Sequence, residues 1–172
     1  MIPRAALALF LCLALASPAH SADYEDAFPP RGRPMQLVPD IINSAKHSIH
    51  VATYTLTSKP IAEALRNAHK RGVDVKVVAK QKEDKGKYAA VAYLANQGVP
   101  VRLNSNYAVR QNTFLIVDGR HIQAGSAGNS AAAVDKNAEN ALIVQDAADL
   151  APLYETEWWR LWDEGVAVKP TN

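Results

Sequence analysis

The stretch RQNTFLIVDGRHIQAGS, residues 110–126, places one apolar run on each side of a turn. This pattern predicts a β-hairpin. A two-residue loop at Gly119 and Arg120 pairs Asp118 with His121. The pairing then continues along the strands as Val117 with Ile122, Leu115 with Ala124, and Thr113 with Ser126.

Side chains alternate across a strand, so this register divides the hairpin between two faces. One face carries Gln111, Thr113, Leu115, Val117, Ile122, Ala124 and Ser126, and the other carries Phe114, Ile116, Asp118 and His121. His121 then points away from Gln111 and Thr113, so it is a poor candidate for a nucleophile on their face. Asp118 lies at the turn, where we expect it to accept local backbone hydrogen bonds rather than contact a ligand.

The flanking sequence predicts an α/β fold. Periodic apolar residues predict helices over residues 36–46, 58–71, 88–97 and 150–163. Strand-like runs predict four further strands at residues 48–54, 73–79, 99–103 and 141–144. The first three precede the hairpin and the fourth follows it. A strand–helix–strand unit of this kind favours parallel pairing with a right-handed crossover. Residues 23–33 are polar and contain Pro29 and Pro30, which indicates an N-terminal arm. We therefore expect one mixed sheet flanked by helices.

The N-terminus has the pattern of a secretion signal. Arg4 precedes an apolar run of twelve residues, 5–16, and small residues follow at Ala19, Ser21 and Ala22. We expect residues 1–22 to be cleaved and residues 23–172 to form one domain in the periplasm or outside the cell, with no integral membrane segment. That domain would contain 18 Lys and Arg against 17 acidic residues, since only Arg4 is lost from the total of 19. This balance does not identify a partner.

The ordered series of segments resembles the small, single-motif endonucleases of the phospholipase D superfamily. The resemblance is carried by residues 48–58, 60–78, 88–102 and 114–126, by NAEN at 137–140, and by the Trp-rich final helix. It covers nearly all of the chain after the signal. It implies a phospholipase D-like mixed sheet with one HxKxxxxD motif per chain, and two chains that meet so that two motifs face one phosphodiester.

The resemblance also assigns roles to individual positions. Asp118 matches the motif aspartate, and Gly125 with Ser126 matches the Gly-Ser that follows it. Glu139 matches the acid that orients the histidine. The asparagine expected after Gly-Ser is displaced, since Gly128 stands there, and Asn129 is the candidate to replace it. The expected phosphate-binding residues are Ser126, Asn129 and Asn137.

Two positions depart from the motif. Gln111 stands where the family has its nucleophilic histidine, and Thr113 stands where it has its phosphate-binding lysine. A carboxamide nitrogen is not basic and does not attack phosphorus, and threonine carries no charge. Arg110 is the nearest cation, but in a regular strand it lies on the face opposite Gln111, and only a bulge would turn it inward.

Two functions follow from these observations. The resemblance implies hydrolysis of phosphodiesters through a phosphohistidine, with no metal and no cofactor, acting on nucleic acid in the first place and phospholipid in the second. The substitutions imply that this hydrolysis is impaired in the present chain. The alternative is a non-catalytic protein that binds nucleic acid, a phosphorylated ligand or a partner protein through the old cleft. In both cases the resemblance implies a homodimer.

Three other features have simpler explanations. Residues 59–87 carry nine Lys and Arg against four acids, which is typical of a solvated face, although it also suits a nucleic-acid backbone. His47, His50 and His69 lack partners at metal-ligand spacing, so we expect surface residues and no metal site. Three tryptophans close the final helix, where we expect them to cover the sheet together with Leu150, Leu153, Tyr154 and Leu161.

Overall fold

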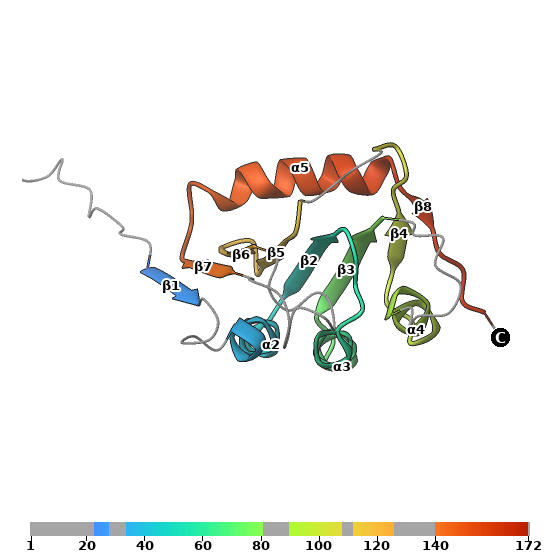
Figure 1. The fold of residues 1–172 in the computed structure, drawn as a ribbon, viewed down its shortest axis with the longest axis horizontal. Coiled ribbons are helices and arrows are strands. Elements are labelled where there is room, and N and C mark those ends of the chain that lie inside the picture. The colour runs from blue at the N-terminus through green and yellow to red at the C-terminus, as the bar shows by residue number, and fades with distance from the viewer. Residues whose placement is uncertain (1–22, 28–33, 81–89, 108–111, 126–139, 172) are drawn as a thin grey trace, which may run out of the picture.

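The computed structural model describes residues 23–27, 34–80, 90–107, 112–125 and 140–171. These ranges form one eight-stranded mixed sheet with helices on both faces (Figure 1). The α/β fold expected from the sequence is confirmed. The helices are α2 (Pro34–Ser44), α3 (Lys59–Lys70), α4 (Ala90–Asn96) and α5 (Ala151–Asp163). The strands are β1 (Asp23–Ala27), β2 (Ser48–Thr53), β3 (Asp74–Ala79), β4 (Val101–Leu103), β5 (Phe114–Val117), β6 (His121–Ala124), β7 (Ala141–Gln145) and β8 (Val166–Ala167).

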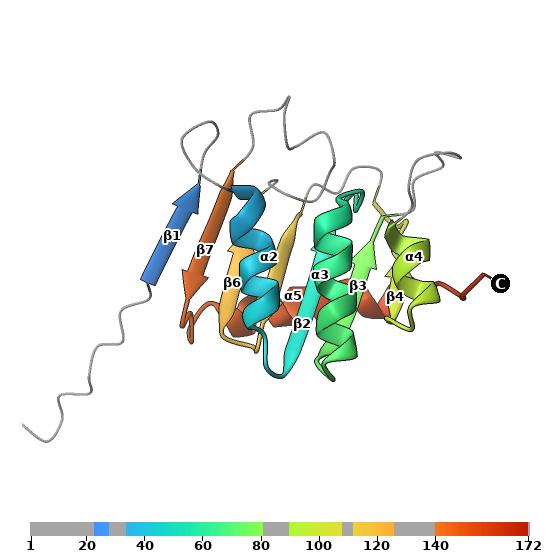
Figure 2. The same cartoon turned by 90° about the horizontal axis from the view of Figure 1, so that it is seen from below.

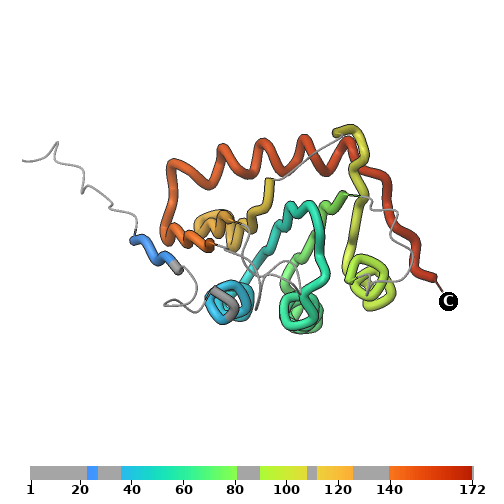
Figure 3. Tube along the Cα trace, viewed as in Figure 1, coloured from blue at the N-terminus to red at the C-terminus, as the bar shows by residue number. Residues whose placement is uncertain are grey.

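The strand order is β1-β7-β6-β5-β2-β3-β4-β8. Strands β2, β3 and β4 are parallel and are joined through α3 and α4, as the strand–helix–strand pattern predicts. The remaining neighbours pair in antiparallel fashion. The first and last strands in the sequence therefore lie at opposite ends of the sheet (Figure 3). No helix in the described ranges has the length and apolar character needed to cross a bilayer.

The prediction of an N-terminal arm over residues 23–33 is wrong for residues 23–27. Residues 23–27 form β1, which pairs with β7 from Asp23 opposite Gln145 to Ala27 opposite Ala141. The segment has no apolar alternation that would mark it as a strand. It becomes one because β7 offers a free edge whose backbone groups need partners. Such pairing depends on a neighbour in space and is not visible in the local sequence.

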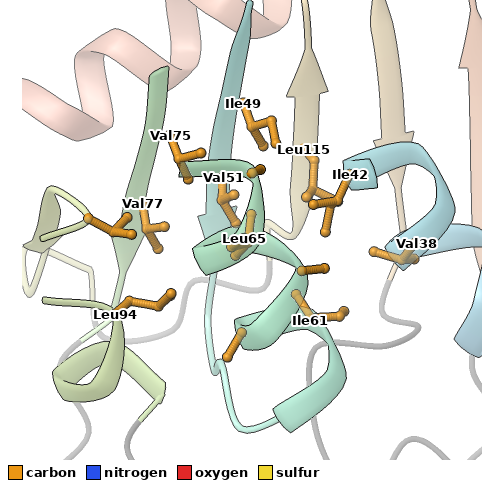
Figure 4. Close-up of a cluster of buried hydrophobic side chains, with 14 of the residues drawn as sticks. Val38, Ile42, Ile49, Val51, Ile61, Leu65, Val75, Val77, Leu94 and Leu115 are labelled. Carbon is orange, nitrogen blue, oxygen red and sulfur yellow. The ribbon is translucent and has the colours of Figure 1, made fainter. Parts of the chain in front are cut away.

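The larger core lies between the sheet and α2, α3 and α4. Figure 4 shows Val38 and Ile42 of α2, Ile61 and Leu65 of α3, and Leu94 of α4 approaching strand residues that include Val51 and Leu115. Helix α3 contributes the apolar face expected from its spacing, since Ile61, Ala62, Leu65 and Ala68 are all buried. Helix α3 ends at Lys70, and Gly72 follows with a φ of +91°, a left-handed conformation that favours glycine.

The opposite face of the sheet is covered by α5, which runs across the strands in Figures 1 and 2. Its buried residues are Ala151, Trp158, Leu161 and Trp162. Trp158 donates a hydrogen bond from Nε1 to the Val51 carbonyl at 3.0 Å and stacks on Trp162, with ring centroids 5.1 Å apart. The tryptophans therefore cover the sheet as expected, apart from Trp159, which is 42% exposed.

The prediction that Leu150 and Leu153 pack against the sheet is wrong. Leu153 is 66% exposed and Leu150 also lies at the surface. Leu150 precedes the helix, which begins at Ala151, so it does not share the helical spacing of the later residues. The stripe that faces the sheet starts instead from Ala151 and continues at helical intervals to Trp158 and Trp162.

We expect Trp158→Ala to destabilise the fold by about 3–5 kcal/mol, because it removes a fully buried aromatic side chain and leaves the Val51 carbonyl without its partner. Chemical denaturation would measure this loss. Trp159→Ala is the matched control, with an expected loss of about 1 kcal/mol because that side chain is half exposed. Equal losses in the two variants would contradict the packing described for α5.

Candidate functional site

The described residues of the HxKxxxxD-like motif lie at opposite ends of the hairpin formed by β5 and β6. The β5 strand begins at the edge of the sheet where β2, β3 and β6 end. We call this the motif edge. Thr113 lies just before β5. Asp118 lies at the opposite edge, in the turn between β5 and β6. Gln111, Ser126, Asn129, Asn137 and Glu139 lie outside the described residues, as does Arg110.

The hairpin exists, but its expected register is wrong by one residue. Val117 pairs with His121, Ile116 with Ile122, Leu115 with Gln123, and Phe114 with Ala124. The turn residues are Asp118 and Gly119, with φ values of +52° and +63°, and Arg120 donates its backbone N–H to the Val117 carbonyl at 3.1 Å. Aspartate and glycine tolerate this left-handed conformation, and Arg120 becomes an extra residue after the turn. The sequence Asp-Gly carried this signal, and the turn was placed one residue too late.

The corrected register changes which side chains share a face. Leu115 and Val117 lie beside Gln123 and His121, while Phe114 and Ile116 lie beside Ile122 and Ala124. The ladder extends to the motif edge, where Gly125 donates its backbone N–H to the Thr113 carbonyl at 3.3 Å. Thr113 therefore lies opposite Gly125, and the expected pairing of Thr113 with Ser126 is not the one observed.

His121 does not point to the face opposite Leu115, as the first register predicted. It shares that face, but it lies at the turn end of the hairpin, while Thr113 lies at the motif edge. Its Nδ1 accepts a hydrogen bond from the Asp146 backbone N–H at 3.2 Å. Four residues of strand separate Val117, its partner, from Thr113, which is about 13 Å at the usual strand rise. His121 thus remains unsuited to replace a nucleophile at Gln111, because of its distance along the strand.

Asp118 has a clear structural role. Its Oδ1 accepts backbone N–H groups from His47 at 2.7 Å and Ser48 at 3.0 Å, and its Oδ2 accepts that of Lys46 at 2.9 Å. The expectation of backbone hydrogen bonds is confirmed, but the donors are not local, since they lie 70 to 72 residues earlier in the chain. The carboxylate therefore fixes the motif hairpin to the start of the neighbouring strand, β2.

These contacts also shift the acidity of Asp118. Desolvation is the largest single influence and would raise the pKa, but the backbone N–H groups of Ser48, His47 and Lys46 together hold the pKa of Asp118 below its usual value. A carboxyl with a lowered folded pKa stabilises the fold above its unfolded pKa, near 3.9. That contribution is lost as the pH falls through the folded pKa.

Gly125 brings two strands of the motif edge into close contact. Its φ is +119°, and a Cβ added there would collide with the backbone carbonyl of Asn140, which precedes β7. Every L-residue other than glycine would be strained in this conformation and would lack the space. The glycine of the Gly-Ser pair is therefore required by the packing of β6 against Asn140, independently of any ligand.

Two buried polar residues near this edge were not foreseen. Gln123 is 0% exposed, and its Oε1 has no hydrogen-bond partner in the described part of the chain. Ser58 is 1% exposed, and its Oγ is likewise without one there. The sequence held one signal, since Gln123 is a polar residue flanked by Ile122 and Ala124 within an otherwise apolar strand. Ser58 occupies the N-cap position of α3, which serine often fills, but it makes no side-chain capping hydrogen bond.

A polar network secures the chain just before the motif. Asn104 donates its side-chain N–H to Glu164 at 3.0 Å and to the Leu161 carbonyl at 3.1 Å. Tyr107 donates its hydroxyl to Glu164 at 3.2 Å, and Arg160 bonds both of these side chains. Hydrogen bonds from Asn104 are the largest influence that lowers the pKa of Glu164, and Tyr107 and Arg160 add to it. Residues 104–107 are thus held against the C-terminal end of α5.

Charged and aromatic groups at the motif edge are sparse in the described ranges. Lys80 follows β3 and places its ammonium 5.2 Å from the centre of the Tyr54 ring. At the start of α3, the Lys59 ammonium lies 3.9 Å from a carboxylate oxygen of Glu63. Residues 81–87, which hold the rest of the basic stretch, lie outside the described residues.

The histidines differ from expectation at one position. His50 is not at the surface, as it is 7% exposed and its Nδ1 lies 2.8 Å from Glu155 Oε2. Its ring stacks on Trp158 with a centroid distance of 4.2 Å. His47 is exposed, as expected, and lines a cleft of about 720 Å³ at the edge opposite the motif, together with Lys46, Asp118 and His121. No group of three or more His, Cys, Asp or Glu within the described ranges is arranged to hold a metal ion.

Comparison with known proteins agrees with this architecture. The sequence profile described as cardiolipin synthase, phospholipase D-like domain matches residues 38–162. The chain belongs to the phospholipase D-like family. Among solved structures, the phospholipase D family member Nuc from Salmonella typhimurium is similar with a TM-score of 0.80 and 34% identity, covering 87% of this chain and 99% of that one. The expected fold and family of a small, Nuc-type member are therefore confirmed.

Curated sequences give a consistent result for this phospholipase D-like chain. A phospholipase D of Rickettsia bellii is 31% identical over 130 residues, which is 76% of this chain and 64% of that protein. A mitochondrial cardiolipin hydrolase of Xenopus laevis is 30% identical over 120 residues, which is 70% of this chain and 57% of that protein. The chain thus spans less than two thirds of the length of these curated relatives.

We expect Asp118→Asn to lower the free energy of unfolding at pH 7 by about 1–3 kcal/mol, because the three backbone N–H groups lose a charged acceptor. The difference from the wild type should shrink below pH 4, where the wild-type carboxyl becomes protonated as well. Urea unfolding at pH 7 and at pH 3 measures both effects. Asp149→Asn is the control, since Asp149 is exposed. A difference that stayed constant with pH would contradict the role given to the Asp118 charge.

Proposed function

We propose that this chain recognises phosphodiesters at the motif edge and that its hydrolytic chemistry is impaired. Family membership supports a phosphodiesterase or nuclease-like protein. The observation that carries the proposal is the contrast within the motif. Asp118 and Gly125 are fully integrated in the fold, whereas the position of the family's phosphate-binding lysine is the uncharged Thr113.

The chemical argument for impairment concerns the nucleophile and the charge. Imidazole near neutral pH can act as base, nucleophile and acid in turn, which a two-step phosphohistidine mechanism requires. The carboxamide of Gln111 has no basic nitrogen. Fixed cations stabilise the negative charge that develops on pentacoordinate phosphorus, and Thr113 supplies none. Loss of the nucleophile alone typically lowers a covalent enzyme's rate by about 10⁴–10⁶.

Nucleic acid is our first choice of ligand, and phospholipid is the second. Similarity to Nuc over 99% of that chain favours the first. The names of the curated relatives, phospholipase D and cardiolipin hydrolase, favour the second. Both ligands present the same phosphodiester group, so binding assays with each are needed to separate them.

The second candidate function is binding without catalysis. It is favoured by the way the scaffold is retained, because the Asp118 contacts and the Asn104–Glu164 network hold the motif segment in place from both sides. Such a protein would bind nucleic acid, a phosphorylated ligand or a partner protein through the former catalytic cleft. Two further proposals accompany both functions. Residues 1–22 direct export to the periplasm or beyond and are removed, and residues 23–172 act as a homodimer whose two motif edges face one ligand.

We expect the purified protein, residues 23–172, to show no EDTA-resistant cleavage of plasmid DNA or of bis-p-nitrophenyl phosphate. The double variant Gln111→His with Thr113→Lys should restore measurable hydrolysis, because it returns the nucleophile and the cation to the retained frame. Each single variant is a control, and each should stay far less active than the double variant. Turnover by the wild type at the level of the double variant would refute the proposed impairment.

We expect a dimer in light scattering at micromolar concentrations, because one motif per chain gives only half of a two-motif site. The measured mass should be twice that of one chain. A monomer at high concentration, both with and without an oligonucleotide, would show that the two motif edges do not meet.

A further inference from the structure

Lys80 and Tyr54 place a cation over an aromatic ring at the motif edge. Strand β2 ends at Thr53 and strand β3 ends at Ala79, so Tyr54 and Lys80 are the residues that follow these strands. The two strands are parallel, with Thr53 opposite Ala79, and the chain therefore leaves both of them at the same edge. The Lys80 ammonium lies 5.2 Å from the centre of the Tyr54 ring.

This pair is close to the start of the motif strand. The Lys80 backbone N–H donates to the Thr53 carbonyl at 3.3 Å. Strand β5 lies on the other side of β2, where Phe114 is opposite Ala52. Because that pairing is antiparallel, its next step brings Thr113 beside Thr53. Two strand spacings thus separate Lys80 from Thr113, which is about 10 Å between their backbones.

The side chains of Lys80 and Thr113 belong to different faces of the sheet. Val78 lies in the core that α5 covers, and Lys80 is two residues further along the same strand, which keeps it on that side. Leu115 lies in the opposite core, and Thr113 is two residues before it. We therefore expect Thr113 and the Lys80 ammonium to make separate contacts, which a ligand with several phosphates in a row can satisfy together.

The Tyr54 ring restricts the position of the Lys80 ammonium. A lysine side chain is long and flexible, so fixing it on a ligand costs conformational entropy. The face of an aromatic ring attracts a cation, and an ammonium has three N–H donors, so contact with a ring leaves donors that can bind an anion. Both side chains are half-buried, which leaves each of them partly open to solvent. The uncharged ring thus holds the cation in place and does not neutralise it.

We propose that Lys80, positioned by Tyr54, binds the phosphate of a nucleic-acid strand that neighbours the phosphodiester at Thr113. Lys80 brings positive charge to the motif edge from the end of β3, whereas Thr113 brings none. The contact requires at least two phosphates in one ligand, so it favours a polynucleotide over a small phosphodiester. This inference rests on the proposed function, because both concern one ligand at one edge.

The contact adds affinity and does not replace the lost chemistry. Lys80 meets a phosphate that does not react, so its charge stabilises the bound substrate and the transition state alike. The nucleophile missing at Gln111 is not restored by it. A protein with this contact is therefore expected to bind oligonucleotides and still to turn them over poorly.

The test is the salt dependence with which residues 23–172 bind a short oligothymidylate. Each contact between a lysine and a phosphate of a single strand adds about 0.7 to the slope of log K against log salt concentration, where K is the association constant. Lys80→Gln should therefore reduce that slope by about 0.7 and weaken binding about five- to tenfold at about 50 mM salt. Lys80→Arg keeps the charge and should retain both the slope and the affinity.

Lys76→Gln is the matched control for the loss of a lysine. Lys76 lies on the same strand four residues before Lys80, its ammonium is 5.9 Å from the centre of the Trp159 ring, and it pairs with Asp74. It is about 13 Å further from the motif edge. We expect Lys76→Gln to leave the slope and the affinity for the oligothymidylate unchanged.

Two variants examine the positioning role of Tyr54. Tyr54→Leu removes the ring and should weaken binding of the oligothymidylate by about threefold, because the ammonium loses its support. Tyr54→Phe keeps the ring and should bind as the wild type does. If Tyr54→Phe bound as weakly as Tyr54→Leu, the ring would not be what positions Lys80.

A ligand with one phosphodiester separates the Lys80 contact from the contact at Thr113. Bis-p-nitrophenyl phosphate carries a single phosphate, so Lys80→Gln should bind it as tightly as the wild type does. In NMR spectra of the wild type, the signal of the Lys80 methylene next to the ammonium should shift with the oligothymidylate and stay in place with bis-p-nitrophenyl phosphate. This measurement needs no substitution, so a folding defect cannot imitate it.

The outcomes distinguish this inference from the proposed function. Equal affinity and equal slope for the wild type and Lys80→Gln would overturn the role of Lys80 and leave the proposed function standing. Wild-type protein that bound neither the oligothymidylate, nor bis-p-nitrophenyl phosphate, nor vesicles that contain cardiolipin would overturn both. Binding to the vesicles that depended on Lys80, without binding to the oligothymidylate, would overturn nucleic acid as the ligand of Lys80.

Discussion

The contact on which the motif hairpin depends is a single carboxylate that accepts three consecutive backbone N–H groups. Asp118 Oδ1 and Oδ2 receive the amides of Lys46, His47 and Ser48, where α2 has ended and β2 begins. Lys46 and His47 precede β2 and Ser48 is its first residue, so the carboxylate provides acceptors where the strand is only beginning. The same residue adopts the left-handed conformation of the turn, so one side chain sets both the bend of the hairpin and its position against the centre of the sheet.

From this anchor the rest of the motif edge can be followed outward. The β5 strand runs beside β2 to the edge where α3 begins, and β6 returns to the close contact between Gly125 and Asn140. At the far side, Asn104 and Tyr107 are held against Glu164 before the chain enters the motif. Thr113, which the resemblance aligns with the family's lysine, thus lies next to a backbone pair that continues the ladder of the hairpin. Thr113 itself carries no side-chain charge.

Much of this arrangement is visible in the sequence, because it rests on local patterns. The apolar spacing of Ile61, Ala62, Leu65 and Ala68 placed α3 and its buried face correctly, and the apolar runs around Asp118-Gly119 gave the hairpin. The register failed by one residue because two turns were compatible with the same pattern, and the φ values that favour Asp118-Gly119 are a property of the folded chain. A one-residue slip reverses the face of every side chain, which is why His121 was misplaced.

The remaining differences arise from contacts between distant segments. β1 forms only because β7 has a free edge, and His50 is buried only because Trp158 and Glu155 of α5 come to rest on it. The roles assigned to the candidate site residues stay predictions, and the structure gives Asp118 a structural role. The sequence did not reveal that Ser58 and Gln123 each bury a side-chain oxygen without a hydrogen-bond partner in the described part of the chain, because such a partner depends on which distant segments come together in the folded chain.

The tight contact at Gly125 has a consequence for how such motifs are used to assign activity. A side chain there would meet the Asn140 backbone whether or not the protein ever bound a substrate. Natural selection for folding alone would therefore preserve this glycine, together with Asp118, long after a nucleophile had been lost. In genome surveys, the presence of this aspartate and this glycine therefore indicates common descent and a shared fold. Only the histidine and lysine positions report whether a given protein can still do the chemistry.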